Sequence, residues 1–106
     1  MILHKSNKYC REYKNILMKH QKELIEAIEK IEKLLIECDN FQVLNRNPFY
    51  KIYHFEKLVG DRQGYYSVRI GGSERIILKP NIDEPYNFIE IDEIIMEEIN
   101  TIHYKK

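Results

Sequence analysis

Residues 58–78 constrain the fold more than any other part of this chain. They read Leu-Val-Gly-Asp-Arg-Gln-Gly-Tyr-Tyr-Ser-Val-Arg-Ile-Gly-Gly-Ser-Glu-Arg-Ile-Ile-Leu. Residues 60–64 and 71–73 are rich in Gly, Asp and Ser, which favour tight turns. Between and after these turns, residues 65–70 and 74–79 carry the aromatic and β-branched side chains typical of strands. The segment therefore predicts a β-hairpin.

The hairpin has one register that separates its apolar side chains from its polar ones. A three-residue turn at 71–73 pairs Ile70 with Glu74 and places Arg69 opposite Arg75. One face then holds Tyr66, Val68, Ile76 and Leu78, and the other holds Tyr65, Ser67, Arg69, Arg75, Ile77 and Lys79. A two-residue turn would mix the two sets, so we expect the three-residue turn.

A helical region precedes the hairpin. Residues 9–39 contain neither Gly nor Pro, and apolar side chains recur there at steps of three and four, which is the spacing of one helix face. These positions are Leu17, Leu24, Ile28, Ile31, Leu35 and Cys38. About 30 residues is long for a helix in a small domain, so a helical hairpin with a break near His20 and Gln21 is favoured over one continuous helix.

The remaining segments complete a prediction of an α+β fold. Ile2 and Leu3 are expected to start a brief edge strand, and Asn40 to end the helical region in the left-handed conformation. Further along the chain, we expect a loop at 45–48, a strand at 51–58, a loop at 80–86 and a last strand at 88–99, for which a helix over 93–98 is the alternative.

These assignments predict one domain of 106 residues, which is the size of a single compact core. It has an N-terminal helical hairpin at about 9–39, packed on a small antiparallel β-sheet at about 51–99, and a C-terminal tail at 100–106. Cys10 and Cys38 both lie in the helical region. We expect them to be reduced thiols, because a disulfide would need antiparallel helices that bring these two positions together.

Charge, composition and the N-terminus exclude several classes of function. Lys plus Arg and Asp plus Glu number 17 each, so a protein that coats nucleic acid by bulk charge is disfavoured, and any such role needs a local patch. The Cys and His residues have no metal-site spacing, so no metal or cofactor is expected. The N-terminus carries no long apolar run, which predicts a cytoplasmic protein with no signal peptide and no membrane contact.

Arg69 and Arg75 are the first candidates for function. Like charges directly opposite each other on a hairpin are destabilising, so the pair indicates either a bound anion or nearby carboxylates. The planar donor forks of two guanidiniums suit a phosphate. The alternative is a solvated network in which Glu56, Glu74 or Glu97 neutralises them.

Histidine and tyrosine side chains add the elements of a ribonuclease site. His54, on the strand expected before the hairpin, and His103, near the C-terminus, could transfer protons near neutral pH. One would remove a proton from a ribose 2′-hydroxyl and the other would protonate the leaving 5′-oxygen. Tyr65 and Tyr104 are candidates for stacking an unpaired base. Each histidine is alternatively a surface or capping residue, and His4 and His20 receive no role.

The chain also resembles a known family. The pattern Leu58-x-Gly-Asp-Arg-x-Gly-x-Tyr-Ser-Val-Arg-Ile, followed by Glu-Arg-Ile-Ile and a β-like segment ending near a His, resembles the HigB branch of the RelE/ParE toxin superfamily. The resemblance runs from about Tyr9 to His103 and is strongest over residues 56–79. The order of a helical hairpin followed by an antiparallel sheet is similar to that family's fold.

The resemblance implies a bacterial toxin of a type II toxin–antitoxin pair. HigB and RelE members are endonucleases that cut messenger RNA on the translating ribosome and use basic and aromatic residues in place of a metal. Their partner is a cognate antitoxin, often a helix-turn-helix protein in the HigB branch. By position, the resemblance implies the catalytic residues His54, Arg69, Arg75 and His103. The basic and aromatic residues expected to bind the RNA are Lys57, Arg62, Tyr65, Lys79 and Tyr104.

Two positions depart from the family pattern. The family's C-terminal Asp-Tyr-His reads Thr101-Ile102-His103 here, with Tyr104 next in sequence. Where the turn is often Leu-Lys-Gly-Asp, this chain has Val59, and Lys57 is the nearest substitute for the lysine.

Two other classes of function stay open. One is a toxin of the same fold that is not a nuclease, either a ParE-like inhibitor of a DNA topoisomerase or a decayed toxin that only binds its antitoxin. The other is a helical interaction module built on residues 9–39.

Overall fold

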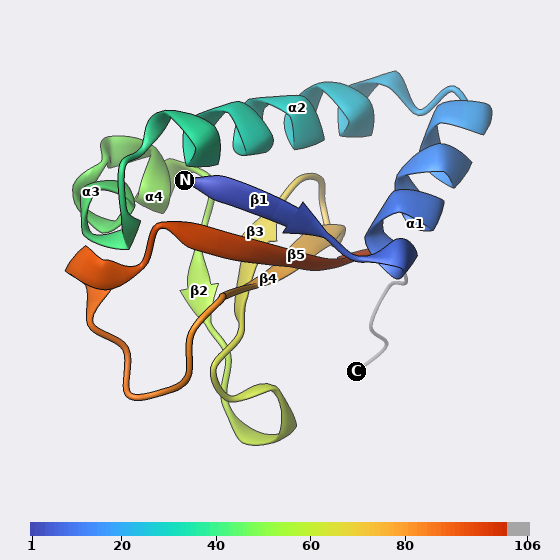
Figure 1. The fold of residues 1–106 in the computed structure, drawn as a ribbon. Helices are drawn as coiled ribbons and strands as arrows, with labels where there is room; N and C mark the ends of the chain where they lie inside the picture. The colour runs from blue at the N-terminus through green and yellow to red at the C-terminus, as the bar shows by residue number, and fades with distance from the viewer. Residues whose placement is uncertain (102–106) are drawn as a thin grey trace.

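The computed structural model describes residues 1–101 and has an α+β architecture in which helices cover one face of a mixed sheet (Figure 1). The five strands have the spatial order β1-β5-β4-β3-β2. Their bounds are Ile2–Lys5 (β1), Glu56–Lys57 (β2), Tyr66–Arg69 (β3), Arg75–Pro80 (β4) and Glu93–Asn100 (β5). The helices are Asn7–Met18 (α1), Lys22–Glu37 (α2), Phe41–Arg46 (α3) and Pro48–Ile52 (α4), and two 3₁₀ turns span Gly60–Arg62 (η1) and Phe88–Glu90 (η2). The expected fold class is confirmed.

The helical hairpin is confirmed, with its break at residues 19–21. Ser6 caps α1, because its side chain accepts a hydrogen bond from the backbone N–H of Tyr9. His20 adopts a left-handed backbone conformation with φ 55° in the break. Of the apolar stripe, Leu17 is exposed because the break separates it from the face of α2 that enters the core. That face consists of Ile28, Ile31, Leu34 and Leu35. Cys10 and Cys38 are both free thiols, the first exposed and the second buried.

The register of the β-hairpin is confirmed residue by residue. Arg69 pairs with Arg75 and Val68 with Ile76, and the backbone N–H of Ile70 donates to the carbonyl of Glu74 at 3.0 Å. The apolar face of the hairpin joins the main core with α2, α3 and β5. Its members are Tyr66, Val68, Ile70, Ile76 and Leu78. The alternation of the sequence therefore determined which face is buried.

Residues 40–55 differ from the prediction. Asn40 has an extended φ of −155° and, instead of ending a helix, begins α3 by accepting a hydrogen bond from Val43 N–H. The expected loop at 45–48 contains the end of α3 and the start of α4, where Asn47 is the N-cap and Pro48 the first helical residue. The expected strand at 51–58 is wrong for most of its length, because Lys51 and Ile52 end α4 and the strand is only Glu56–Lys57.

Strands β1 and β5 also test the predictions made from the sequence. The N-terminal edge strand is confirmed, but it runs parallel to β5, so the sheet is mixed and not purely antiparallel. The expected last strand at 88–99 is wrong at its start, because Phe88–Glu90 form the η2 turn. The strand spans Glu93–Asn100, which rules out the helical alternative at 93–98. Within residues 1–101, no helix combines the length and the apolar character needed to span a membrane.

Candidate nucleic-acid interface

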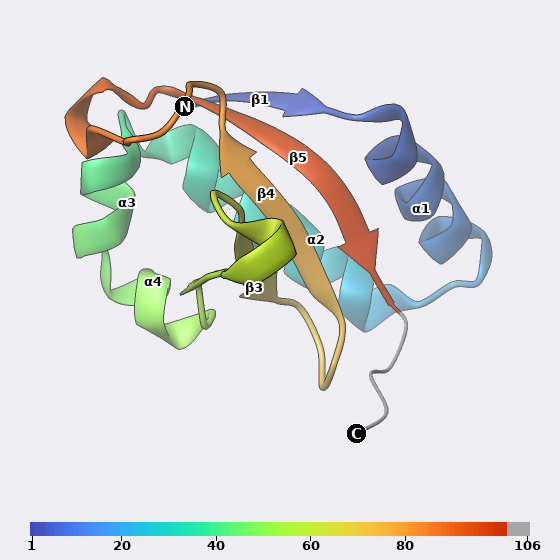
Figure 2. The same ribbon diagram turned by 90° about the horizontal axis from the view of Figure 1, so that it is seen from below.

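One face of the sheet is not covered by helices, and we call it the open face. It carries Ser67, Arg75, Ile77 and Glu98, whose side chains alternate with the core residues of β3, β4 and β5. The loop that contains η1 crosses this face, as the view from below shows (Figure 2). Because the loop covers part of the face, Ser67, Ile77 and Glu98 are buried at 1%, 5% and 7% exposure. The open face is therefore a recessed surface with a polar centre.

A cavity of about 390 Å³ lies between the loop and the open face. Leu58, Val59 and Ile77 form its apolar wall. Its polar groups come from Arg62, Ser67, Arg75 and, at the end of β5, Asn100. A cavity of this kind offers guanidinium donors for an anion beside an apolar surface for a flat group.

Arg75 is the half-buried cation at the base of this cavity. Its Nη1 lies 3.7 Å from Glu56 Oε2 and donates to Ser67 Oγ at 3.4 Å. The Glu56 side chain is 56% exposed, so this long ion pair contributes little stability and competes weakly with another anion. The neutralising network foreseen as an alternative is thus present at Glu56, in a weak form.

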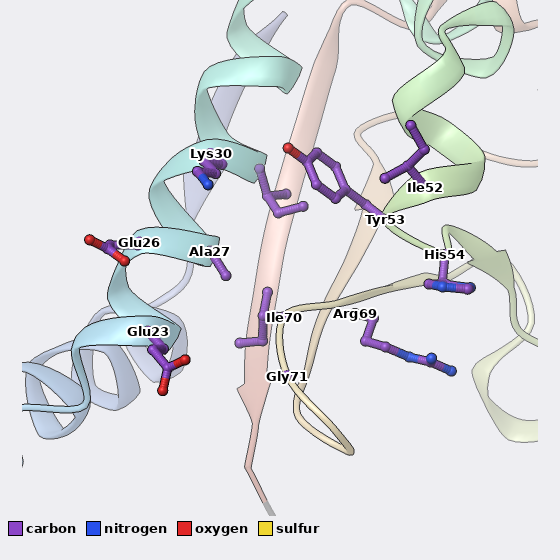
Figure 3. Close-up of a pocket in the computed structure, with 11 residues that line it drawn as sticks. Glu23, Glu26, Ala27, Lys30, Ile52, Tyr53, His54, Arg69, Ile70 and Gly71 are labelled. Carbon is purple, nitrogen blue, oxygen red and sulfur yellow. The ribbon is translucent and has the colours of Figure 1, made fainter.

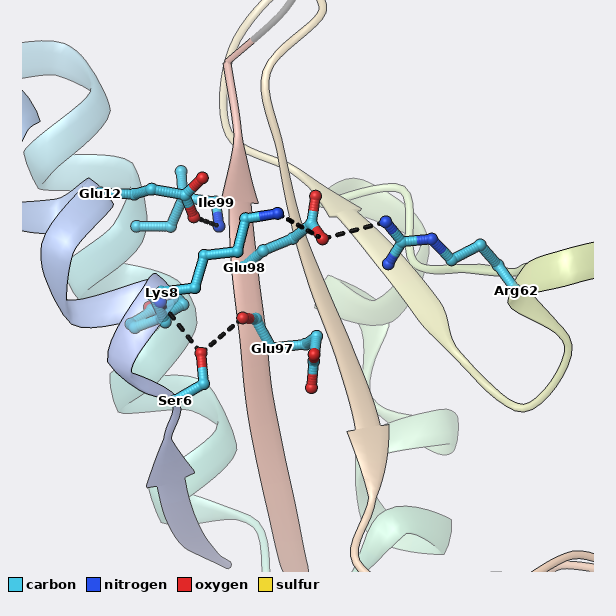
Figure 4. Close-up of polar contacts among 8 residues, drawn as sticks. Ser6, Lys8, Glu12, Arg62, Glu97, Glu98 and Ile99 are labelled. Carbon is cyan, nitrogen blue, oxygen red and sulfur yellow. Dashed lines mark hydrogen bonds and ion pairs between the residues drawn. The ribbon is translucent and has the colours of Figure 1, made fainter.

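Arg62 forms an ion pair with Glu98, a contact that no pattern in the sequence predicts. Its Nη2 donates to Glu98 Oε1 at 3.0 Å, and Lys8 Nζ approaches the same oxygen at 3.4 Å (Figure 4). The ladder between β4 and β5 shifts register at Ile77 and Leu78, which pair with Glu98 and Met96 and leave Glu97 as the extra residue. This bulge turns Glu98 toward the open face and returns Ile99 to the core. A bulge of this kind has no signature in the residues themselves.

Tyr65, Arg62 and Lys79 form a cluster beside the cavity. The guanidinium carbon of Arg62 lies 5.7 Å from the centroid of the Tyr65 ring, and Lys79 Nζ lies 5.3 Å from it. Both cations therefore lie within cation–π range of the ring. Three of the expected RNA-binding residues are therefore brought together, whereas Lys57 is exposed on β2.

His54 and Arg69 line a different cavity, of about 410 Å³, between α2 and the outer edge of β3 (Figure 3). The sequence predicted that His54 lies on a strand, and this prediction is wrong. His54 follows α4 with a left-handed φ of 57°. The backbone N–H of Arg69 donates to the carbonyl of Tyr53 at 3.0 Å, which fixes the arginine next to this turn. Within residues 1–101, no ion pair involves Arg69.

The expected tail residues His103 and Tyr104 lie outside the residues that the structure describes. Asn100, three positions before His103, lines the open-face cavity. The structure thus gathers Arg62, Tyr65, Arg75 and Lys79 on one side of the sheet and places His54 and Arg69 together at its edge.

Sequence comparison identifies no relative of this chain. No protein-family model matches it, and no curated protein matches it.

Solved structures, in contrast, match almost the whole chain. A YoeB/ParE toxin from Agrobacterium tumefaciens superposes with a TM-score of 0.65 at 19% identity, covering 98% of this chain and 100% of that one. The heterotetrameric YoeB-YefM toxin-antitoxin complex from Staphylococcus aureus matches with a TM-score of 0.60 at 21% identity, covering 98% of both chains. A YafQ variant from E. coli superposes with a TM-score of 0.65 at 18% identity, covering 93% of this chain and 90% of that one. At these identities the likeness concerns the fold, and this chain has the fold of the YoeB-, YafQ- and ParE-type toxin structures.

Proposed function

We propose that this protein is the toxin of a type II toxin–antitoxin pair and that it is a metal-independent endoribonuclease. Its substrate is messenger RNA on the translating ribosome, which places its action in the cytoplasm. The resemblance of residues 56–79 to the HigB branch supports a cognate antitoxin of the helix-turn-helix, HigA-like type. Likeness over nearly the full length to a YoeB/ParE toxin and to a YoeB-YefM toxin-antitoxin complex supports the first part of this proposal.

The observation that carries the nuclease proposal is the position of Arg75 at the base of the open-face cavity. Its nearest carboxylate is the exposed Glu56 at 3.7 Å, so the guanidinium retains donors for a phosphate. Arg62 also lines this cavity, and together with Lys79 it contacts the Tyr65 ring, which adds charge and an aromatic surface beside the cavity. Cationic and aromatic groups that converge on one recess are the features used to bind single-stranded RNA.

The chemistry needs three events at one phosphate. A proton leaves the ribose 2′-hydroxyl, negative charge builds on the phosphate, and the leaving 5′-oxygen gains a proton. We assign the stabilisation of charge to Arg75 and the protonation of the 5′-oxygen to His103, while solvent water accepts the proton of the 2′-hydroxyl. His103 follows Asn100, a residue of the cavity, by three positions in the sequence. We assign His54 and Arg69 to the neighbouring RNA backbone, because they line the other cavity.

A toxin that is not a nuclease is the second candidate. The Agrobacterium structure with this fold is a toxin of the ParE as well as the YoeB type, and a ParE-like protein would inhibit a DNA topoisomerase. A decayed toxin that only binds its antitoxin belongs to the same class. In all these cases messenger RNA would stay intact in cells that express the chain.

Inducible expression in bacterial cells tests the proposal. We expect growth arrest and discrete new 5′ ends of RNA within translated reading frames, and we expect the Arg69→Ala/Arg75→Ala double variant to lose both effects. The matched control is Arg11→Ala/Arg46→Ala, which removes two exposed arginines on α1 and α3 and should retain both effects. Growth arrest with intact transcripts and a DNA-damage response would instead support the ParE-like function.

A further inference from the structure

Glu98 is a buried carboxylate on the open face, beside the cationic side chains of Arg62 and Lys8. It is 7% exposed, and its Oε1 accepts hydrogen bonds from Arg62 and Lys8. Burying a carboxylate is unfavourable unless it is paired, and replacing such a group by an apolar one is often neutral or stabilising. Stability alone therefore does not explain why a buried carboxylate occupies position 98.

The start of α1 fixes the backbone on both sides of Glu98. The hydroxyl of Ser6 donates to the carbonyl of Glu97, and the N–H of Ile99 donates to the carboxylate of Glu12 at 2.8 Å (Figure 4). Strand β1 pairs with β5 only as far as Met96, so these two side chains replace the strand partner that β5 lacks beyond that point. The Glu98 carboxylate consequently projects from a backbone that is held in place.

Arg62, the partner of Glu98, lies in a loop that forms part of the open-face cavity. Arg62 ends η1, and the same loop supplies Leu58 and the 82% exposed Val59 to the apolar wall. The η1 turn itself is local, with hydrogen bonds from Gln63 N–H to Gly60 and from Tyr65 N–H to Arg62. The bond from Arg62 to Glu98 connects this local turn to β5, 36 residues away in sequence.

We propose that Glu98 is a positioning residue of the open-face site. Its carboxylate holds the Arg62 guanidinium over the sheet and thereby holds the wall of Leu58 and Val59 beside Arg75. The importance of this contact for RNA cleavage rests on the proposed function, but the contact and its effect on the loop do not.

Hydrogen exchange of the loop amides tests the positioning directly. In Glu98→Gln, which keeps the shape of the side chain and removes its charge, we expect the amides of Gln63 and Tyr65 to exchange about tenfold faster or more, because a charge-assisted hydrogen bond is lost. The amides of Ile77 and Leu78 in β4 should be unchanged. The matched control is Glu97→Gln, which changes the net charge equally at the adjacent residue, whose side chain forms no ion pair within residues 1–101.

Unchanged loop exchange in Glu98→Gln, or an equal acceleration in Glu97→Gln, would overturn the proposal. If Glu98→Gln does not fold, Arg62→Gln removes the same contact from the exposed side of the pair and should loosen the same amides. Loop amides that stay protected in Arg62→Gln would be equally decisive against it.

RNA cleavage supplies the second readout. We expect Glu98→Gln to lower kcat about tenfold while its RNA affinity stays equal or rises, because the site becomes more positive. Glu97→Gln should keep kcat. A Glu98→Gln variant with wild-type kcat would show that the position of Arg62 does not matter for the reaction. If the wild-type protein cleaves no RNA, the proposed function fails, and hydrogen exchange still decides the role of Glu98.

Discussion

Arg69 and Arg75 lie directly opposite each other on the β3–β4 ladder, yet they line different cavities. Strand β2 is two residues long and pairs only with Tyr66 and Ser67, so the edge of β3 beyond them is open to the turn that carries His54. Directly opposite residues project from the same face, so Arg69 shares the open face with Arg75 and also borders the cavity at this edge. We expect the two guanidiniums, which border different cavities, to contact two phosphates of one RNA strand.

Separate phosphate contacts predict that the effects of the two arginines on RNA affinity add. We expect Arg69→Ala and Arg75→Ala each to weaken binding of a single-stranded RNA and each to reduce the salt slope of log K by about 0.7. The double variant should lose the sum of the two free energies to within about 0.5 kcal/mol. Titrations at several salt concentrations measure both quantities. A strongly non-additive double variant would indicate one shared phosphate.

The Tyr65 ring, which Arg62 and Lys79 contact, is expected to stack on a base. Tyr65→Leu should weaken single-stranded RNA binding by about 1–3 kcal/mol, because an aliphatic side chain offers no π-face. Tyr65→Phe keeps the ring and should bind as the wild type does, which makes it the matched control. Fluorescence anisotropy with a labelled RNA measures both. Equal losses in the two variants would assign the effect to the hydroxyl group.

The hairpin was predictable because its information is local. Alternating apolar residues and the turn at 71–73 define the register, and the Arg69–Arg75 pair follows from it without any distant contact. The break in the helical region was predictable from its length, because about 30 residues is long for a helix in a small domain. The sequence therefore predicted the register of the β3–β4 hairpin and the division of the helical region into α1 and α2.

The features that the sequence did not reveal are short or depend on distant segments. Helices α3 and α4 have six and five residues, too few for a periodic pattern, although Asn40 and the pair Asn47-Pro48 carry readable N-cap signals. The position of Glu98 depends on a bulge against β4, and the contact from Lys8 depends on the parallel pairing of β1 with β5. The separation of His54 from Arg75 follows from α4, so it could not be foreseen once that helix was taken for a strand.

Two glycines of the η1 loop are expected to differ in their tolerance of a side chain. Both have positive φ, 69° at Gly60 and 92° at Gly64, but an added Cβ at Gly60 meets nothing, whereas at Gly64 it lies 3.1 Å from Glu84 Oε1 and 3.2 Å from Tyr86 Oη. Gly60→Ala should lower the free energy of unfolding by about 1–2 kcal/mol from backbone strain alone. Gly64→Ala should lower it further, by about 1 kcal/mol or more, because the hydrogen bond from Tyr86 to the Gly64 carbonyl is disturbed as well.

Chemical denaturation of both variants measures these free energies. Equal losses for Gly60→Ala and Gly64→Ala would mean that the contact with Tyr86 does not hold the loop.

Tyr9 is expected to make the stability of the fold depend on pH above about 10. Its ring is 1% exposed and its hydroxyl donates to Glu32 Oε2 at 2.6 Å. Burial, and then this hydrogen bond, raise the pKa of Tyr9 well above its ordinary value of 10.0. A raised pKa contributes stability that is fully present below the unfolded-state pKa and is lost as pH rises above it.

Tyr9→Phe tests this contribution. At pH 7 we expect the variant to be less stable by about 1–3 kcal/mol, because the Glu32 carboxylate loses its donor. The difference from the wild type should shrink as pH rises above about 10, where the unfolded wild type ionises. Urea denaturation across pH 7–11 measures it. A difference that stays constant over this range would contradict the assignment.

The proposed function depends above all on Arg75, with Arg69 beside it on the ladder, binding the backbone of RNA that the protein cuts. Primer extension on a defined messenger RNA, in a reconstituted translation reaction that contains the purified protein, decides whether it does. We predict discrete new 5′ ends within the reading frame for the wild type and for Arg11→Ala/Arg46→Ala, and none for Arg69→Ala/Arg75→Ala. Identical 5′ ends from the Arg69→Ala/Arg75→Ala variant, or an intact transcript with the wild type, would refute the proposal.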